Sequence, residues 1–169
     1  QRMIEWFKMN NKNIGNIDLS EYETGQSYET SYQQIVSDHE EYRSAAYKLL
    51  HTYSHMLMQQ STVHTGLDTQ SLSEKIYPAI ASVFIYTTNP INIGGLESTF
   101  DIDLQNWLKK MVELSSDCPQ DPSCMLDEDG ACNACSFAPE FVCTFFNQEL
   151  DRSTLVGNSS RYEWGYLVG

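Results

Sequence analysis

The chain has 169 residues, of which 41% are hydrophobic, with ten Tyr, seven Phe and three Trp. This length and composition suit one globular domain with a packed core and exclude a disordered tail. Ten Lys and Arg against 23 Asp and Glu give a formal net charge of -13. Because nucleic-acid affinity comes largely from cations that neutralise phosphates, this charge argues against general, direct DNA binding. The negative charge could instead serve for docking on a basic partner or simply keep the protein soluble.

The sequence also lacks membrane and secretion signals. No stretch approaches the roughly 20 consecutive apolar residues of a transmembrane helix, and the first residues do not resemble a signal peptide. We therefore expect a cytoplasmic protein without membrane contact. The chain begins with Gln1 and ends with Gly169 without an evident terminus, which leaves open that it is a piece of a longer protein.

The first 37 residues are predicted to form an N-terminal segment or linker, with the main domain at residues 38–169. Residues 1–9 alternate weakly between apolar and polar side chains, as in an edge strand or in a tail from an upstream domain. Residues 10–37 are rich in Asn, Ser, Thr, Gln, Glu and Tyr and poor in aliphatic side chains, which is typical of a loop.

A long core helix is predicted over residues 38–64. Ser37-Asp38-His39-Glu40 is a capping box, in which the Ser hydroxyl and the Glu carboxylate bond free backbone amides at a helix start. Side chains then form an apolar stripe at helical spacing, and Gly66 offers a C-terminal stop. The stripe consists of Tyr42, Ala45, Ala46, Leu49, Leu50, Tyr53, Met56, Leu57 and Gln60.

After the core helix, a second capping box at Ser71–Glu74 predicts a short helix that ends at Tyr77, because Pro78 disfavours helical geometry in the residue before it. The uncharged segment 79–87 is rich in β-branched and aromatic residues and is predicted to be a buried strand.

The chain is predicted to turn at Asn89-Pro90 and at Gly94-Gly95, and a third helix is predicted from about residue 101 to 115. A last helix is predicted near Thr144–Leu150. The expected fold is therefore α+β: a small helical domain with a buried strand or small sheet, followed by a cysteine-rich loop.

All five cysteines lie in one short segment, Cys118-x5-Cys124-x7-Cys132-x2-Cys135-x7-Cys143. Zinc takes four thiolates tetrahedrally, and the short turn of a Cys-x-x-Cys pair aims two sulfurs at one point. Three other interpretations compete: a disulfide framework, a thioredoxin-like redox pair and isolated buried thiols. The odd count and the lack of a secretion signal disfavour disulfides, and a redox pair would open a helix directly after a strand.

Spacing alone does not decide which four of the five cysteines bind zinc. Cys132 and Cys135 form the knuckle, and Cys124 is the next candidate. The fourth ligand is either Cys118, which would make two pairs, or Cys143, which would place seven residues on each side of the knuckle. We expect one structural zinc ion, since nothing indicates an open ligand position or an acid that would activate water.

Two histidines, His51 and His55, lie one helical turn apart, which is the spacing of metal ligands. A zinc-protease motif needs Glu directly after the first His as the general base, and Thr52 stands there. The favoured interpretation is that both rings bond to loop backbone beside the apolar stripe. A second, non-catalytic metal site that includes His64 is the alternative. No triad order, phosphate-binding Gly loop or Walker motif is present, so no catalytic or cofactor-binding residues are predicted.

Residues 49–157 resemble the zinc-binding domain called MZB. This domain occurs at the C-terminal end of DNA helicases of the mitomycin repair factor A type and in the DrmB subunit of the DISARM anti-phage system. The resemblance rests on ordered motifs: Leu50-His51-Thr52-x-Ser54-His55-x-Leu57, Ser71-Leu72-x-Glu74-x-Ile76-Tyr77, Ile85-Tyr86-Thr87, Gly94-Gly95-Leu96, Cys118-x-x-Asp121-Pro122-x-Cys124, Gly130-Ala131-Cys132-x-Ala134-Cys135 and Pro139-Glu140-x-x-Cys143-x-x-x-Asn147-x-x-Leu150-Asp151-Arg152.

The resemblance implies a metal site made by the cysteines. Shorter relatives resemble the segment from Cys124 to Cys143, which favours Cys124, Cys132, Cys135 and Cys143 as the ligands, with Cys118 as a neighbouring thiol. Asn147, Asp151 and Arg152 are carried over as positions that tie the last helix to the zinc loop.

The Asp-Pro in the first cysteine pair, the Ala-Cys-x-Ala-Cys knuckle and the Leu-Asp-Arg tail look more like the DrmB branch. That branch implies a non-catalytic subunit that works with a superfamily-2 helicase or translocase supplied by another chain, in anti-phage defence or DNA repair. DNA would then be reached through the complex. Two alternatives remain: a zinc module that binds nucleic acid directly, and a metal-dependent enzyme that uses His51 and His55.

Overall fold

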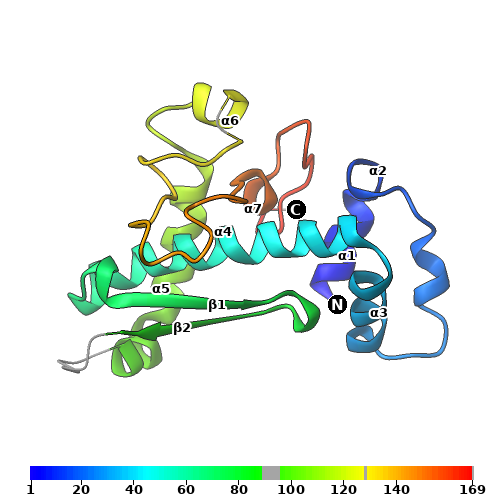
Figure 1. Cartoon of the computed structure of the whole chain (residues 1–169), viewed down its shortest axis with the longest axis horizontal. Helices are drawn as coiled ribbons and strands as arrows, with labels where there is room; N and C mark the ends of the chain where they lie inside the picture. The colour runs from blue at the N-terminus through cyan, green and yellow to red at the C-terminus, as the bar shows by residue number, and fades with distance from the viewer. Residues whose placement is uncertain (89–95, 128, 169) are drawn as a thin grey trace.

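One long helix, α4 (Glu40–Thr65), organises the molecule, and most other elements pack along it (Figure 1). The computed structural model describes residues 1–88, 96–127 and 129–168. The N-terminal helices lie at one end of α4, a two-stranded sheet runs along one side, and the cysteine-rich segment lies toward the other end, around α6. Buried side chains of α4 include Tyr42, Ala46, Leu49 and Met56, as the apolar stripe predicts.

The predicted core helix is confirmed, and its start needs a correction. α4 begins at Glu40 after His39, whose side chain makes no capping bond, whereas Ser37 lies inside the preceding helix. The junction between two helices has only one non-helical residue, so the capping box marks the junction and not a fresh start from a loop. α4 ends as predicted at Gly66, where a left-handed φ of 70° suits a residue without a Cβ.

The N-terminal segment is helical, so the predicted edge strand at residues 1–9 and loop at residues 10–37 are wrong. Its elements are α1 (Arg2–Met9), α2 (Asn11–Ile14), the 3-10 helix η1 (Leu19–Tyr22) and α3 (Tyr28–Asp38). Ser27 caps α3 by accepting a hydrogen bond from the Thr30 amide. Trp6 and Phe7 are fully buried in the same core cluster as the stripe of α4. The domain boundary at residue 37 stays a prediction.

The short helix predicted after Ser71 is wrong, because this segment is a strand. β1 (Leu72–Tyr77) pairs antiparallel with β2 (Ser82–Thr87), in the register Leu72↔Thr87. The 3-10 helices η2 (Thr69–Ser71) and η3 (Pro78–Ile80) flank β1. Leu72 and Glu74 are buried toward α4, and this tertiary contact overrides the local helix signal.

The strand predicted within residues 79–87 is confirmed over β2, although it is half-buried and not fully buried. The predicted turns at Asn89-Pro90 and Gly94-Gly95 lie outside the described residues. The third predicted helix is confirmed as α5 (Leu96–Ser116), which crosses α4 and begins earlier than expected.

The C-terminal part of the chain has little regular structure. It contains the short helices α6 (Ser123–Asp127) and α7 (Ser153–Val156). The helix predicted near Thr144–Leu150 is wrong, because this segment forms turns in which Phe146, Asn147 and Glu149 all have positive φ. Three left-handed residues within four positions are incompatible with an α-helix.

The described elements are mainly helical and include one small antiparallel sheet, which confirms the predicted α+β class. Within the described part of the chain, no helix is both long and apolar enough to cross a membrane.

Candidate metal centre

Four of the five cysteines come together in one buried cluster. Cys118 follows the end of α5, Cys124 lies on α6, and Cys132 and Cys135 form the predicted knuckle after Gly130. The four residues are no more than 6% exposed. Their sulfur atoms all lie within 4.8 Å of one another, and none of them forms a disulfide.

The sulfur–sulfur distances fit a zinc ion. Cys118 and Cys132 are 3.6 Å apart at their Sγ atoms, and the Cys124–Cys135 and Cys132–Cys135 distances are both 3.7 Å. A tetrahedral ion with Zn–S bonds of about 2.3 Å separates its ligand sulfurs by about 3.8 Å. The backbone amide of Gln120 donates to Cys118 Sγ at 3.4 Å, and that of Cys132 donates to Cys135 Sγ at 3.3 Å. The residues present therefore suit zinc.

A buried arginine lies beside this cluster and offsets part of its negative charge. Zinc with four thiolates carries a net charge of about -2, which is costly to bury without a cation nearby. Arg152 is fully buried, and its Nη2 lies 3.8 Å from Cys124 Sγ. The same Nη2 donates to both carboxylate oxygens of Asp121, at 2.7 and 2.9 Å. Burial raises the pKa of Asp121, but the hydrogen bond and charge of Arg152 outweigh it and lower that pKa.

The same arginine connects the separate parts of the metal centre. Arg152 Nη1 donates to the Ser115 carbonyl at the end of α5, and Nε donates to the Gly130 carbonyl before the knuckle. Asn147 bonds the backbone of Ala138 through both its amide atoms, at 2.8 Å each. Arg152 therefore connects the C-terminal segment to the cysteine-rich loop, and Asn147 connects it to Ala138, just after the knuckle. The helix that these residues were expected to tie down is absent, because residues 144–150 are turns.

Asp151 anchors the C-terminal segment beside Arg152. Its Oδ1 accepts hydrogen bonds from the amide and the hydroxyl of Ser153, and its Oδ2 pairs with Arg161 at 2.7 Å. Its backbone amide donates to the hydroxyl of Thr52 on α4. Thr52, which takes the place of the catalytic Glu of a zinc protease, therefore has a structural contact.

The fifth cysteine, Cys143, lies in a different cluster, which corrects the preference for Cys143 over Cys118 as the fourth zinc-loop ligand. Its Sγ is 3.1 Å from His51 Nε2 on α4. The preference failed because a resemblance of shorter relatives to residues 124–143 does not determine where a loop without regular structure runs, and neither does the symmetric spacing around the knuckle. Metal binding by each of the five cysteines stays a prediction.

Both predicted histidines join Cys143, and Glu74 completes the group. His51 and His55 are at most 1% exposed, and their Nε2 atoms lie 3.2 and 3.0 Å from Glu74 Oε1. Sequence reasoning missed Glu74 because it assigned this residue to a helix cap. Had it predicted a strand, the alternation would have placed Glu74 on the buried face with Leu72.

Burial opposes the charged forms in this second cluster, but the hydrogen bonds between its members dominate. They lower the pKa of Glu74 to about 2 and that of Cys143 to about 6, and they raise the pKa of His55 to about 9. The pKa of His51 is also raised. His64, the third histidine considered from the sequence, pairs with Asp103 on α5 and stands apart from this cluster.

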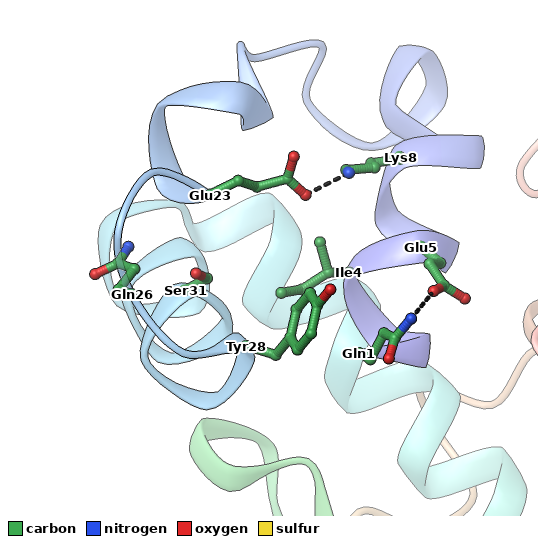
Figure 2. A pocket seen from close by; sticks show the side chains of 8 residues that line it. All are labelled: Gln1, Ile4, Glu5, Lys8, Glu23, Gln26, Tyr28 and Ser31. Atoms are coloured by element: carbon green, nitrogen blue, oxygen red, sulfur yellow. Dashed lines mark hydrogen bonds and ion pairs between the residues drawn. The ribbon is translucent and has the colours of Figure 1, made fainter.

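One hollow of the molecule lies away from both clusters. It has a volume of about 480 Å³ and lies between α1 and residues 23–31. Figure 2 shows the side chains that line it. Lys8 and Glu23 form an ion pair across it, and Gln1 donates to Glu5 at its edge. Its lining residues are Gln1, Ile4, Glu5, Lys8, Glu23, Gln26, Tyr28 and Ser31. We assign no chemistry to this cavity.

Comparison with known proteins agrees with the metal centre. The model of the MZB family, described as the MrfA Zn-binding domain, matches residues 53–136, which include the four clustered cysteines. A relative named DISARM protein DrmB, from Bacillus paralicheniformis, is 34% identical over 128 residues. The match covers 68% of this chain and 23% of the relative, so the chain spans less than a quarter of that protein's length. The chain therefore belongs to the MZB family of zinc-binding domains, and its buried four-cysteine cluster suits one zinc ion.

Proposed function

We propose that this chain is a non-catalytic zinc-binding part of an assembly with a superfamily-2 DNA helicase or translocase, in anti-phage defence or DNA repair. One observation carries the proposal: the MZB match together with the similarity to a DISARM protein. The family resemblance described from the sequence links such domains to these helicases. DNA would be reached through the complex, because a net charge of -13 disfavours direct phosphate binding. We also assign the protein to the cytoplasm, since zinc thiolates persist in a reducing compartment.

The closed form of the zinc loop supports a structural role. A catalytic zinc ion keeps one position open for water or substrate, whereas structural sites use four protein ligands. The four clustered thiols are buried and are enough to complete a tetrahedron. We therefore propose that the zinc ion holds the loop against α4 and α5 and takes no part in a reaction.

The outer face of the β-hairpin is the surface that we expect to meet the partner. Leu72 and Glu74 point toward α4, so alternation places Tyr77 and Phe84 on the opposite face, where they are 46% and 58% exposed. Tyr77 and the half-exposed Phe145 line the same hollow of about 280 Å³. Exposed aromatic side chains beside a shallow hollow are typical of protein interfaces.

The test is copurification of the full chain with a superfamily-2 helicase encoded beside it. We expect the wild type to retain the helicase and a Tyr77→Ser, Phe84→Ser double variant to lose it. Ile102→Ser is the matched control, because Ile102 is 85% exposed on α5 and lies on a different element. If the double variant retains as much helicase as Ile102→Ser does, the hairpin face is not the binding surface.

Other outcomes would reject the function itself. Failure of the wild type to bind any neighbouring helicase would contradict the partnership, and a stoichiometric ATPase activity of the purified chain would contradict the non-catalytic role. Tight DNA binding that weakens steeply with salt would favour the direct nucleic-acid module instead.

A further inference from the structure

A second set of metal-binding side chains lies outside the four-cysteine cluster. His51 and His55 come from successive turns of α4, Glu74 comes from β1, and Cys143 comes from the loop before α7. Their ligand atoms all lie within 4.8 Å of one another. All four residues are buried, with exposed fractions from 0 to 7%.

The donor atoms and their spacing suit a tetrahedral ion. Zinc binds imidazole nitrogen, thiolate sulfur and carboxylate oxygen at about 2.0–2.3 Å, so neighbouring donors around it are about 3.3–3.8 Å apart. His51 Nε2 is 3.1 Å from Cys143 Sγ and 3.2 Å from Glu74 Oε1, and His55 Nε2 is 3.0 Å from that same oxygen. An ion at the centre requires these atoms to move apart by only a few tenths of an ångström.

Neighbouring groups orient the donors toward one point. His55 Nδ1 lies 2.9 Å from the Ser136 carbonyl, which only accepts, so Nδ1 carries a hydrogen. Nε2, which faces Glu74, is therefore the nitrogen that can bind a metal ion once it releases its own proton. The hydroxyl of Ser54 donates to Glu74 Oε2 and leaves Oε1 facing the two rings. Metal-ligating histidines and carboxylates are typically fixed in this way by hydrogen bonds behind them.

His51 has a complementary arrangement. Its Nδ1 is buried and has no hydrogen-bond partner among the described residues, whereas its Nε2 approaches both Cys143 and Glu74. The polar contacts of this ring are therefore directed at the centre of the cluster. A buried polar atom without a partner is costly, so the ring position needs a favourable interaction at Nε2.

We propose that His51, His55, Glu74 and Cys143 bind a second divalent metal ion, of the zinc class. The mixed nitrogen, oxygen and sulfur donors match zinc better than the oxygen sites of magnesium or calcium. Four buried protein ligands leave no open position for water, so the ion is structural. It joins β1 and the Cys143 loop to α4. The two sites are adjacent in the chain, because Ser136, which orients His55, directly follows Cys135 of the zinc loop.

Metal content measured by mass spectrometry on the purified, dialysed full chain tests the proposal. We expect two zinc ions per chain for the wild type, one for each four-ligand group. His51→Ala and Cys143→Ala each lose one ion, and so does Cys132→Ala in the other cluster. His64→Ala is the matched control, because His64 lies on the same helix, pairs with Asp103 and keeps both ions.

A measurement on the wild type keeps the test independent of variant folding. X-ray absorption at the zinc edge should show sulfur together with nitrogen or oxygen neighbours, whereas the four-cysteine site alone gives sulfur only. One ion per chain with an all-sulfur shell would overturn the proposal and leave a hydrogen-bonded network held by protons. Two ions that persist in both His51→Ala and Cys143→Ala would place the second ion elsewhere. Neither result depends on a helicase partner.

Discussion

Arg152 shows how one side chain holds several segments together. It is fully buried, yet it has partners in three places: Asp121 in the first cysteine pair, the Ser115 carbonyl and the Gly130 carbonyl. A buried cation is stable only when it is paired and hydrogen-bonded. The sequence resemblance implies only that Arg152 helps to tie the end of the chain to the zinc loop, and the structure identifies Asp121 as its ion-pair partner.

We predict that Asp121→Asn lowers the free energy of unfolding by roughly 2–4 kcal/mol, because it removes the carboxylate that pairs with the buried guanidinium. This range is set below that of a fully buried ion pair because the Asp121 side chain is 26% exposed and solvent screens part of the interaction. Glu40→Gln is the control: it removes the Arg43–Glu40 pair, whose side chains are 49% and 70% exposed, and should cost less than about 1 kcal/mol. Urea unfolding of both zinc-loaded variants measures the difference, and equal losses would contradict the role of Arg152.

At the level of elements, long periodic segments could be predicted from the sequence, and short ones could not. The stripes of α4 and α5 each bury one face against a core, so the local pattern matches the tertiary environment. The segment Leu72–Tyr77 carries a helix-start pattern but pairs with β2, because its burial against α4 decides the outcome. A two-stranded sheet is marginal alone and depends on such packing.

The candidate site could be predicted in its chemistry but not in its pairing. The spacing of the five cysteines predicts a metal site, and the short turn between Cys132 and Cys135 pairs these two residues. For His51 and His55 the favoured interpretation is a bond to loop backbone, and Glu74 is missed. Assigning Cys118 to one cluster and Cys143 to the other requires the path of the turns after Cys135. That path depends on residues with a left-handed backbone, such as Phe146 and Glu149. The sequence does not reveal these positions, because neither is a glycine, the residue that usually marks this conformation.

Helix α1 belongs to the same packed core as α4. The polar composition of the N-terminal segment did not predict this packing. Trp6 is fully buried, stacks on Tyr162 at 5.3 Å between ring centroids, and donates from Nε1 to the Trp164 carbonyl. We predict that Trp6→Ala lowers the free energy of unfolding by about 3–5 kcal/mol, through a lost hydrogen bond and a cavity.

Circular dichroism during urea unfolding tests this prediction and also the domain boundary at residue 37. For Trp6→Ala we expect a single unfolding transition at a lower urea concentration. Tyr28→Ala is the control on α3, where the side chain is 52% exposed, and it should lower the free energy of unfolding by about 0.5 kcal/mol or less. Two transitions, of which Trp6→Ala moves only one, would show that residues 1–37 fold as a separate unit.

For the whole molecule, the four-cysteine cluster and the main core are built from different parts of the chain. Among the described residues, the buried members of the largest core cluster include none between Met111 and Leu155, the interval that contains every cysteine. That interval has little regular secondary structure, so few repeated backbone hydrogen bonds hold it in place. The cysteine ligands and the hydrogen bonds of Arg152 take over this role. Loops of this kind take their stability from the ion, whose binding free energy is available for folding.

We therefore predict that chelation of zinc unfolds the cysteine-rich segment while the main core persists. Backbone amides between Cys118 and Cys135 should lose protection from hydrogen exchange, because opening this segment no longer requires release of the metal ion. Amides near Ala46 and Leu49 should stay protected, since the apolar contacts of α1 and α3 with α4 do not involve the metal. Hydrogen exchange followed by mass spectrometry, before chelation, after it and after zinc is restored, measures both regions. A uniform loss of protection over the whole chain would show instead that the core cannot fold without the ion.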